Sequence, residues 1–406
     1  MTDLPAQGEN ALPPIDPERP PEGHLPSMLL RLLSTSGARA ILSGKSADLG
    51  LADNLPFPFM ALVGQVEMRI ALLLTVINPA VSGVLLIGPR GTGKTTAVRA
   101  LTTLLPDVEV SACEEGQGCL PDDYAREGAA GICASCLKKI RAQESITRWG
   151  AVQMLELPLN ARIDDVVGGV NERIAVQQQK VRLERGILAR ADQNLLYVDE
   201  VNLLEDPIVD AILDAAAAGS YTVRRGAIAG TYRSRFVLIG SMNPEEGALR
   251  PQLMDRFGLR VVVRGLMNRE ERLEIYQRVR AYRTNPRTFI KDWAAATVNA
   301  REEIGVARDL LKEVELTTDA LDLGLELVRR LDIDSHRAEY VMLEAARAYA
   351  AADGRTEATI ADVRAVAPLA LRLRRSQYMV EFSEQQRAED ALIRTQIDTI
   401  LQGDTA

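Results

Sequence analysis

Short apolar segments alternate with helical patterns through the middle of the chain, from residue 56 to residue 265. Each segment is a run of four or five mostly apolar residues, and the four runs are 84–87, 195–198, 236–239 and 259–263. Helical patterns stand between them, for example at 95–105 and 207–218. Because such alternation is typical of parallel strands that are buried on both faces, it predicts an α/β domain with a helix-covered parallel sheet.

The pattern becomes helical almost throughout after residue 266. Residues 337–353 form an alanine-rich amphipathic pattern that ends at Gly354, a residue favoured just after a helix. Thr359, followed three residues later by Asp362, is typical of the start of the next helix. We therefore expect an all-α C-terminal domain over residues 266–406.

The beginning of the chain has a different composition. Residues 1–26 contain seven prolines and few large apolar side chains, so this segment is unable to bury a core. We expect residues 1–55 to form a Pro-rich flexible N-terminal extension. The segment has no basic and apolar leader, and Asn-Pro and Ser-Gly pairs interrupt the uncharged window 70–87. We therefore expect a cytoplasmic protein without a membrane span.

Composition narrows the possible chemistry. The 406 residues have a formal net charge of −8, and aromatic residues make up 4% of them. An acidic chain with few aromatic residues is a poor general binder of nucleic acid, and we expect no such partner. The chain has two histidines, His24 and His336, which argues against imidazole catalysis and histidine-rich metal sites.

A phosphate-binding loop follows the first predicted strand. It matches G-x-x-x-x-G-K-[ST] in full, with the residues Gly88, Pro89, Arg90, Gly91, Thr92, Gly93, Lys94 and Thr95. Glycines let the backbone N–H groups point at phosphate oxygens, and the N-terminus of the following helix favours the same anion. Lys94 would reach the β- and γ-phosphates, and the Thr95 hydroxyl would ligate Mg²⁺. The loop therefore predicts that the chain binds ATP with Mg²⁺.

Acidic and polar residues follow two other predicted strands. Asp199 and Glu200 end the run at 195–198, and Asn243 follows the run at 236–239. Strand ends meet beside the phosphate loop in open α/β sheets, so Asp199 would hold Mg²⁺ through water and Glu200 would polarise the attacking water. Asn243 would lie near the γ-phosphate if its strand neighbours the central one; otherwise it belongs to an Asn-Pro turn.

Two arginines are candidates for contacts with the γ-phosphate. Arg256 precedes the last predicted strand, and Arg337 opens the alanine-rich helix. An arginine near the γ-phosphate stabilises charge in the transition state and can come from another subunit. The alternative for either residue is a surface ion pair, worth at most about 1 kcal/mol.

These motifs together resemble an AAA+ ATPase. Three long stretches, at 57–74, 186–219 and 240–259, resemble more narrowly the I subunit of magnesium chelatase; the last reads GSMNPEEGALRPQLMDRFGL. With the phosphate loop, the resemblance covers most of residues 57–375. It implies an ATPase motor that drives the insertion of Mg²⁺ into protoporphyrin IX in chlorophyll or bacteriochlorophyll biosynthesis.

The resemblance also implies partners and residue roles. It implies a homo-oligomeric ring, a hexamer, with ATP at the subunit interfaces, and association with a D subunit and a large porphyrin-binding H subunit. It implies Asn243 as sensor 1, Arg256 as the arginine finger and Arg337 as sensor 2, and it places Val63, Gly64 and Gln65 near the adenine. The alternatives are the ATPase of a cobalt chelatase, a MoxR-type chaperone and a helicase-like motor on DNA.

Two insertions of the family correspond to parts of this chain. Residues 160–185 correspond to an insert in the second helix, and residues 220–235 predict a hairpin with Arg225-Gly226 near its turn. Both segments are either loops without function or elements that line a ring pore or contact a partner.

All four cysteines of the chain fall within the segment 113–136. They are Cys113, Cys119, Cys133 and Cys136. The spacing Cys133-x-x-Cys136, with two further thiols nearby, suits a tetrahedral Zn²⁺ site or an iron–sulfur cluster. The first two cysteines are six positions apart rather than three, which weakens the match. A redox-active set of thiols and unliganded loop cysteines are the alternatives.

Overall fold

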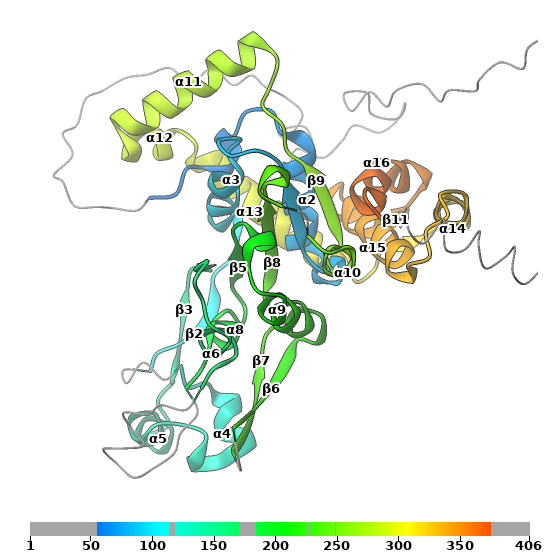
Figure 1. The fold of residues 1–406 in the computed structure, drawn as a ribbon. Coiled ribbons are helices and arrows are strands. Elements are labelled where there is room, and N and C mark those ends of the chain that lie inside the picture. Colours follow the sequence, from blue (N-terminus) through cyan, green and yellow to red (C-terminus); the bar gives the residue numbers. More distant parts are fainter. Residues whose placement is uncertain (1–54, 114–117, 170–183, 226–227, 248, 375–406) are drawn as a thin grey trace, which may run out of the picture.

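The computed structural model of the chain describes residues 55–113, 118–169, 184–225, 228–247 and 249–374. Its core is a five-stranded sheet in the order β4-β5-β8-β1-β9, with all neighbours parallel (Figure 1). The strands are β1 (Val84–Ile87), β4 (Met154–Leu157), β5 (Leu195–Val198), β8 (Val237–Met242) and β9 (Leu259–Val262). The predicted parallel sheet is therefore confirmed.

Helices cover both faces of the sheet, as predicted. Leu86 and Tyr197 point into one core, and their strand neighbours Leu85 and Leu196 point into the other. The helices of the first core include α2 (Val66–Ile77) and α3 (Lys94–Leu101), and those of the second α8 (Ile187–Arg190), α9 (Asp206–Ala218) and α10 (Pro251–Arg256). Burial on both faces explains why the central strands β1 and β5 are continuous runs without a charged residue.

The strand β4 was not among the predicted strands. Its sequence is Met-Leu-Glu-Leu, and three of its four residues are incompletely buried because the strand lies at the edge of the sheet. The predicted strand at 236–239 is β8, which extends to Met242. The predicted helix at 95–105 ends at Leu101, where a short 3-10 turn takes over.

An extension projects from the amino ends of the central strands, away from α3 and the phosphate loop (Figure 1). It contains the antiparallel pair of β2 (Val108–Ser111) and β3 (Thr147–Gly150), the helices α4 (Pro121–Glu127) and α5 (Ala134–Arg141), and the hairpin of β6 (Ser220–Arg225) and β7 (Ile228–Arg233). The predicted hairpin is thus present. Of the insert at 160–185, the structure describes α6 (Ile163–Val167) and the two ends; residues 170–183 lie outside the described residues.

The C-terminal part is mainly helical, as predicted, but it is neither all-α nor a single group of helices. Its elements are α11 (Arg269–Thr284), α12 (Pro286–Asp292), α13 (Ala294–Leu310), β10 (Glu315–Leu316), α14 (Thr318–Arg330), α15 (His336–Ala352), β11 (Glu357–Ala358) and α16 (Ile360–Leu371). The strands β10 and β11 pair in parallel, which corrects the all-α prediction. Their two-residue length explains why no apolar alternation signalled them.

The C-terminal helices occupy two sides of the core. The helices α11 and α12 lie on one side, and α14, α15 and α16 lie on the other, next to β9 and α10 (Figure 1). The expected capping pair is present, because Asp362 accepts hydrogen bonds from the backbone N–H and the hydroxyl of Thr359. The N-terminal extension, up to residue 54, lies outside the described residues, as does the end of the chain beyond residue 374. Among the helices that are described, none is both long and apolar enough to cross a membrane.

Candidate nucleotide-binding site

The phosphate loop connects β1 to α3 in the predicted strand–loop–helix arrangement. Gly88 passes so close to β9 that a Cβ atom on it would lie 2.0 Å from the carbonyl oxygen of Val263. Gly91 and Gly93 have φ angles of +82° and +86°, in the left-handed region that glycine adopts without strain. Three glycines of the motif are therefore required by backbone geometry, and Lys94 and Thr95 begin the helix α3.

A polar pocket of about 300 Å³ opens over this loop at the carboxyl ends of the strands. Most of the residues predicted to contact nucleotide or Mg²⁺ meet here. The residues that line the pocket are Arg90, Gly91, Thr92, Gly93, Lys94, Thr95, Thr96, Asp199, Glu200, Ser241, Met242 and Asn243. Its size suits a small charged ligand.

Lys94 is held by the loop that carries it. Its Nζ donates hydrogen bonds to the carbonyl oxygens of Gly88 at 2.6 Å and Pro89 at 2.8 Å. Burial lowers the pKa of Lys94, while the carboxylates of Asp199 and Glu200 act in the opposite direction. The ammonium group is thus positioned inside the pocket with two neutral oxygens as its partners, where a phosphate would be a stronger acceptor.

Tyr197 joins the two side chains that were predicted to hold Mg²⁺. Its hydroxyl lies 3.0 Å from the Thr95 Oγ1 and donates to the Asp199 Oδ1 at 2.8 Å. The ring is fully buried in the sheet. Burial raises the pKa of the phenol, while hydrogen bonds with Ser241 and Thr95 act in the opposite direction. Tyr197 therefore remains protonated at neutral pH and orients both side chains.

Ser241 completes this hydrogen-bond network from the neighbouring strand. Its hydroxyl donates to the Asp199 Oδ1 and accepts a hydrogen bond from the backbone N–H of Glu200 at 3.3 Å. Neither Tyr197 nor Ser241 was predicted from the sequence. A signal for them exists: each precedes a candidate residue, Asp199 or Asn243, by two positions, so it lies on the same face of its strand.

Replacing Tyr197 by phenylalanine is expected to raise the Mg²⁺ concentration needed for half-maximal ATP hydrolysis about 10-fold. The change removes one hydroxyl that orients two proposed ligands, and such supporting contacts typically contribute 10- to 100-fold in metal affinity. Hydrolysis measured as a function of Mg²⁺ at saturating ATP tests this.

Tyr221→Phe is the matched control for this variant. The Tyr221 hydroxyl is also partly buried and donates to the carbonyl oxygen of Val167 at 3.0 Å, but it lies on β6, outside the pocket. An equal Mg²⁺ requirement in both variants would contradict the orienting role of Tyr197.

Glu200 has an unusual backbone conformation and a cationic partner. Its φ of 50° and ψ of 50° are left-handed, which costs a non-glycine residue about 1 kcal/mol and is typical of functional positions. The Oε1 atom of Glu200 accepts hydrogen bonds from Arg90 Nε at 2.9 Å and Nη2 at 2.6 Å. Arg90 also pairs with Glu246 at 2.8 Å. The loop arginine thus positions the carboxylate that was predicted to polarise water.

Asn243 lies at the carboxyl end of β8, which does neighbour β1. Its side chain is nearly fully buried, and its Oδ1 accepts from the backbone N–H of Glu245 at 3.3 Å. Asn243 was expected near the γ-phosphate if its strand neighbours the central one, and β8 does lie beside β1. The capping bond to Glu245 also fits the Asn-Pro turn, and both roles are compatible.

Arg256 and Arg337 are not among the described residues that line the pocket. Arg256 ends α10 and pairs with Asp214 on α9 at 2.5 Å and with Asp210 at 3.5 Å. Arg337 lies in the first turn of α15. Burial lowers the pKa of Arg374, and the positive charge of Arg337 lowers it to a smaller extent. Neither arginine is therefore placed at the phosphate loop of its own chain.

The segment Val63–Gly64–Gln65 precedes α2 and packs on the residues that follow β9. Gln65 Nε2 donates to the carbonyl oxygen of Arg264 at 2.6 Å, and a Cβ atom on Gly64 would lie 2.7 Å from the side chain of Leu266. The predicted contact of this segment with adenine stays a prediction. The four cysteines gather in the extension, outside the pocket.

Comparisons with known proteins show which family the chain resembles. Residues 325–395 match the family described as AAA lid domain. The chain is 41% identical over 324 residues to the magnesium-chelatase subunit ChlI homolog of Methanocaldococcus jannaschii, covering 79% of this chain and 87% of that protein. It is 40% identical over 329 residues to the magnesium-chelatase subunit ChlI of Nostoc, covering 80% of this chain and 85% of that protein.

One solved structure is similar as well. A chain in a cryo-EM-based structure of the complex between the BchI and BchD subunits of magnesium chelatase is 39% identical to this chain, with a TM-score of 0.46. The match covers 81% of this chain and 99% of that chain.

The strand order, the phosphate loop and the lid define a P-loop ATPase of the AAA+ class. Within that class, the identity to the two ChlI proteins extends over almost four fifths of the chain. The chain belongs to the family of magnesium-chelatase I subunits.

Proposed function

We propose that this protein is the ATPase motor subunit of a magnesium chelatase, which hydrolyses ATP to drive the insertion of Mg²⁺ into protoporphyrin IX. The observation that carries the proposal is the convergence of Lys94, Thr95, Asp199 and Glu200 on one pocket in a chain whose relatives are named as chelatase I subunits. The same names support magnesium chelatase over a cobalt chelatase, a MoxR-type chaperone or a helicase-like motor.

The pocket suits MgATP. Thr95 and Asp199 offer the hydroxyl and carboxylate oxygens that Mg²⁺ prefers, and both are hydrogen-bonded to Tyr197. The bound ion would neutralise charge on the phosphates. The N–H groups of the loop and the Lys94 ammonium would bind the same phosphates, and the helix α3 would present its N-terminus to them.

Glu200 is the proposed base that orients the attacking water. Its carboxylate is already fixed by Arg90 at the edge of the pocket, and its backbone N–H is bonded to Ser241. Asn243 lies on the adjoining strand end and would hold the γ-phosphate or the water in line. These groups polarise and position the water, which is most of what phosphoryl transfer requires from a protein.

The remaining parts of the site would come from a second copy of the chain. Arg256 and Arg337 lie at the junction of α10 and α15, where Ser335 and Arg374 both bond the carboxylate of Asp255, the residue before Arg256. In a ring, this junction would meet the neighbour's pocket and supply Arg256 as the arginine finger and Arg337 as sensor 2 in trans. Movement of the lid helices would then be transmitted to Arg256 through Asp255. We propose a hexamer.

The proposed motor acts on partner subunits in the cytoplasm. The D subunit and the porphyrin-binding H subunit are the partners that family membership implies. Helix α6, which is the described helix of the insert at 160–185, and the β6–β7 hairpin lie toward the amino ends of the central strands, opposite the phosphate loop (Figure 1). This position favours the insert and the hairpin as elements that line the ring pore or contact these subunits.

Reconstitution tests the proposed function. This chain, combined with D and H subunits, ATP, Mg²⁺ and protoporphyrin IX, is expected to produce the fluorescence of Mg-porphyrin, and omitting any one component should remove it. Lys94→Ala is the internal control: losing a charge-assisted contact of up to about 3 kcal/mol weakens ATP binding about 100-fold. Product formation without ATP, or insertion of cobalt into a corrinoid in place of Mg²⁺ into the porphyrin, would contradict the proposal.

A further inference from the structure

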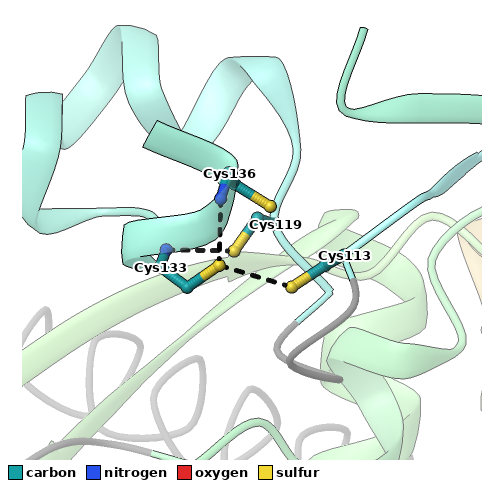
Figure 2. A group of neighbouring side chains, drawn as sticks. All are labelled: Cys113, Cys119, Cys133 and Cys136. Atoms are coloured by element: carbon teal, nitrogen blue, oxygen red, sulfur yellow. Dashed lines mark hydrogen bonds between the residues drawn. The ribbon is translucent and has the colours of Figure 1, made fainter. Parts of the chain in front are cut away.

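The four cysteines come from three separate parts of the extension and meet at one point (Figure 2). Cys113 follows the strand β2, and Cys119 lies just before α4. Cys133 is the N-cap residue of α5, and Cys136 lies in the first turn of that helix. These residues are all the cysteines of the chain, so every thiol of the protein belongs to this cluster.

The sulfur atoms are spaced as a single tetrahedral metal ion requires. All four lie within 4.8 Å of one another, and the Sγ atoms of Cys113 and Cys133 are 3.6 Å apart. With zinc–sulfur bonds of about 2.3 Å, a regular tetrahedron places its sulfurs about 3.8 Å apart. A disulfide would need sulfurs about 2.05 Å apart, and none of the four cysteines forms a disulfide in this structure.

The surroundings of the sulfurs resemble those of a closed structural metal site. Cys119, Cys133 and Cys136 are at most 2% exposed, and Ile132 and Ile146 pack beside them. Two sulfurs already accept hydrogen bonds from backbone N–H groups at 3.3 Å: Cys119 from Cys133, and Cys133 from Cys136. Such N–H groups stabilise thiolate charge and orient metal ligands.

We propose that Cys113, Cys119, Cys133 and Cys136 bind one Zn²⁺ in a tetrahedral four-thiolate site. Tetrahedral sulfur coordination is characteristic of zinc or iron. An iron–sulfur cluster binds its cysteines through separate iron atoms with sulfides between them, which spreads the thiolates more widely than this compact group. Four protein ligands leave no open position for a substrate, so the ion is structural.

The zinc site would stabilise the outer end of the extension. It would join the residues after β2, the residues before α4 and the start of α5, beside a small apolar cluster that includes Ile132 and Ile146. Arg185, at the end of the 160–185 insert, donates to the carbonyl oxygen of Gly118 at 2.6 Å and to Asp123 at 2.6 Å. Arg233 of the β6–β7 hairpin pairs with Asp122. The ion would therefore stabilise the segment 118–123, to which Arg185 of the insert and Arg233 of the hairpin are bonded.

Elemental analysis of the full-length chain, purified without added chelator, tests the site directly. We expect about one zinc per chain, released together with titration of four thiols by a mercurial reagent. Replacement of zinc by Co²⁺ is expected to give the intense visible bands and sulfur-to-metal charge transfer of a tetrahedral thiolate site. This readout uses the wild-type protein and does not depend on whether a cysteine variant folds.

Cys113→Ser, which removes the most exposed ligand, is expected to reduce the zinc content to less than about a tenth. Ala134→Ser is the matched control, because it adds a hydroxyl beside Cys133 and retains all four thiols. ATP binding, measured on the same samples, is expected to be unchanged because the pocket lies at the other end of the sheet.

Three results would overturn the proposal. The first is wild-type protein that contains no zinc and takes up no Co²⁺. The second is a mass lower by two or four hydrogens, which would show one or two disulfides. The third is iron together with acid-labile sulfide.

Discussion

Replacing Arg256 by alanine is expected to reduce ATP hydrolysis about 1,000-fold while leaving ATP affinity nearly unchanged. Arginine fingers contribute 10³- to 10⁵-fold to the rate of nucleotide hydrolysis, and Arg256 does not line the pocket of its own chain. The substitution should cost little stability, because the pairs with Asp214 and Asp210 are at the surface. Steady-state phosphate release and equilibrium ATP binding measure the two effects separately.

A mixing experiment distinguishes action between subunits from action within one chain. When Arg256→Ala is mixed with Lys94→Ala, each of them inactive alone, hydrolysis should be partly restored, because some interfaces then combine the intact pocket of the first variant with the intact arginine of the second. Arg250→Ala is the matched control, since Arg250 forms a comparable surface pair with Asp206 at 2.5 Å near the same helix pair. A mixture of these two variants that stays inactive would argue for a site contained in one chain.

Replacing Glu200 by glutamine is expected to retain ATP binding and to slow hydrolysis about 1,000-fold, within the 10²- to 10⁴-fold range of a positioned base. Glutamine has nearly the same shape and keeps an oxygen that can accept from Arg90, so the pocket should remain intact. It lacks the negative charge that polarises water. Single-turnover hydrolysis of bound ATP is the appropriate measurement, because it excludes effects on product release.

Glu245→Gln is the control for the loss of one acidic charge near the pocket. Glu245 is exposed at the start of the turn that follows Asn243, and its change is expected to alter hydrolysis by less than about 3-fold. If Glu200→Gln hydrolyses ATP as fast as this control, Glu200 is not the base.

The sequence was sufficient for the parts of the site that depend on local backbone geometry. The phosphate loop needs glycine at fixed positions, and the start of a helix needs a capping residue such as Thr359, so these features are visible in a few consecutive residues. The four buried runs were equally clear, because a strand buried on both faces is mostly apolar. The edge strand β4 and the short strands β10 and β11 lacked that signal.

The residues that support the site were not predictable, because their roles depend on contacts between distant segments. Tyr197 reads as one more apolar residue of β5, and its hydroxyl gains a role only where α3 brings Thr95 to it. Ser241 acts on Asp199 across two neighbouring strands. Arg90 matched an unrestricted position of the loop motif, and its partner Glu200 lies 110 positions away in the chain.

The sequence by itself determined the class of this protein and its nucleotide chemistry, because a phosphate loop, an acidic strand end and buried strands are encoded by neighbouring residues. Only the tertiary structure decided which distant side chains meet. It left Arg256 and Arg337 out of the lining of their own chain's pocket, and it gathered cysteines from three segments into one compact group. The physical reason is that the distance between two side chains far apart in a chain is set by packing of the whole fold, which no local pattern records.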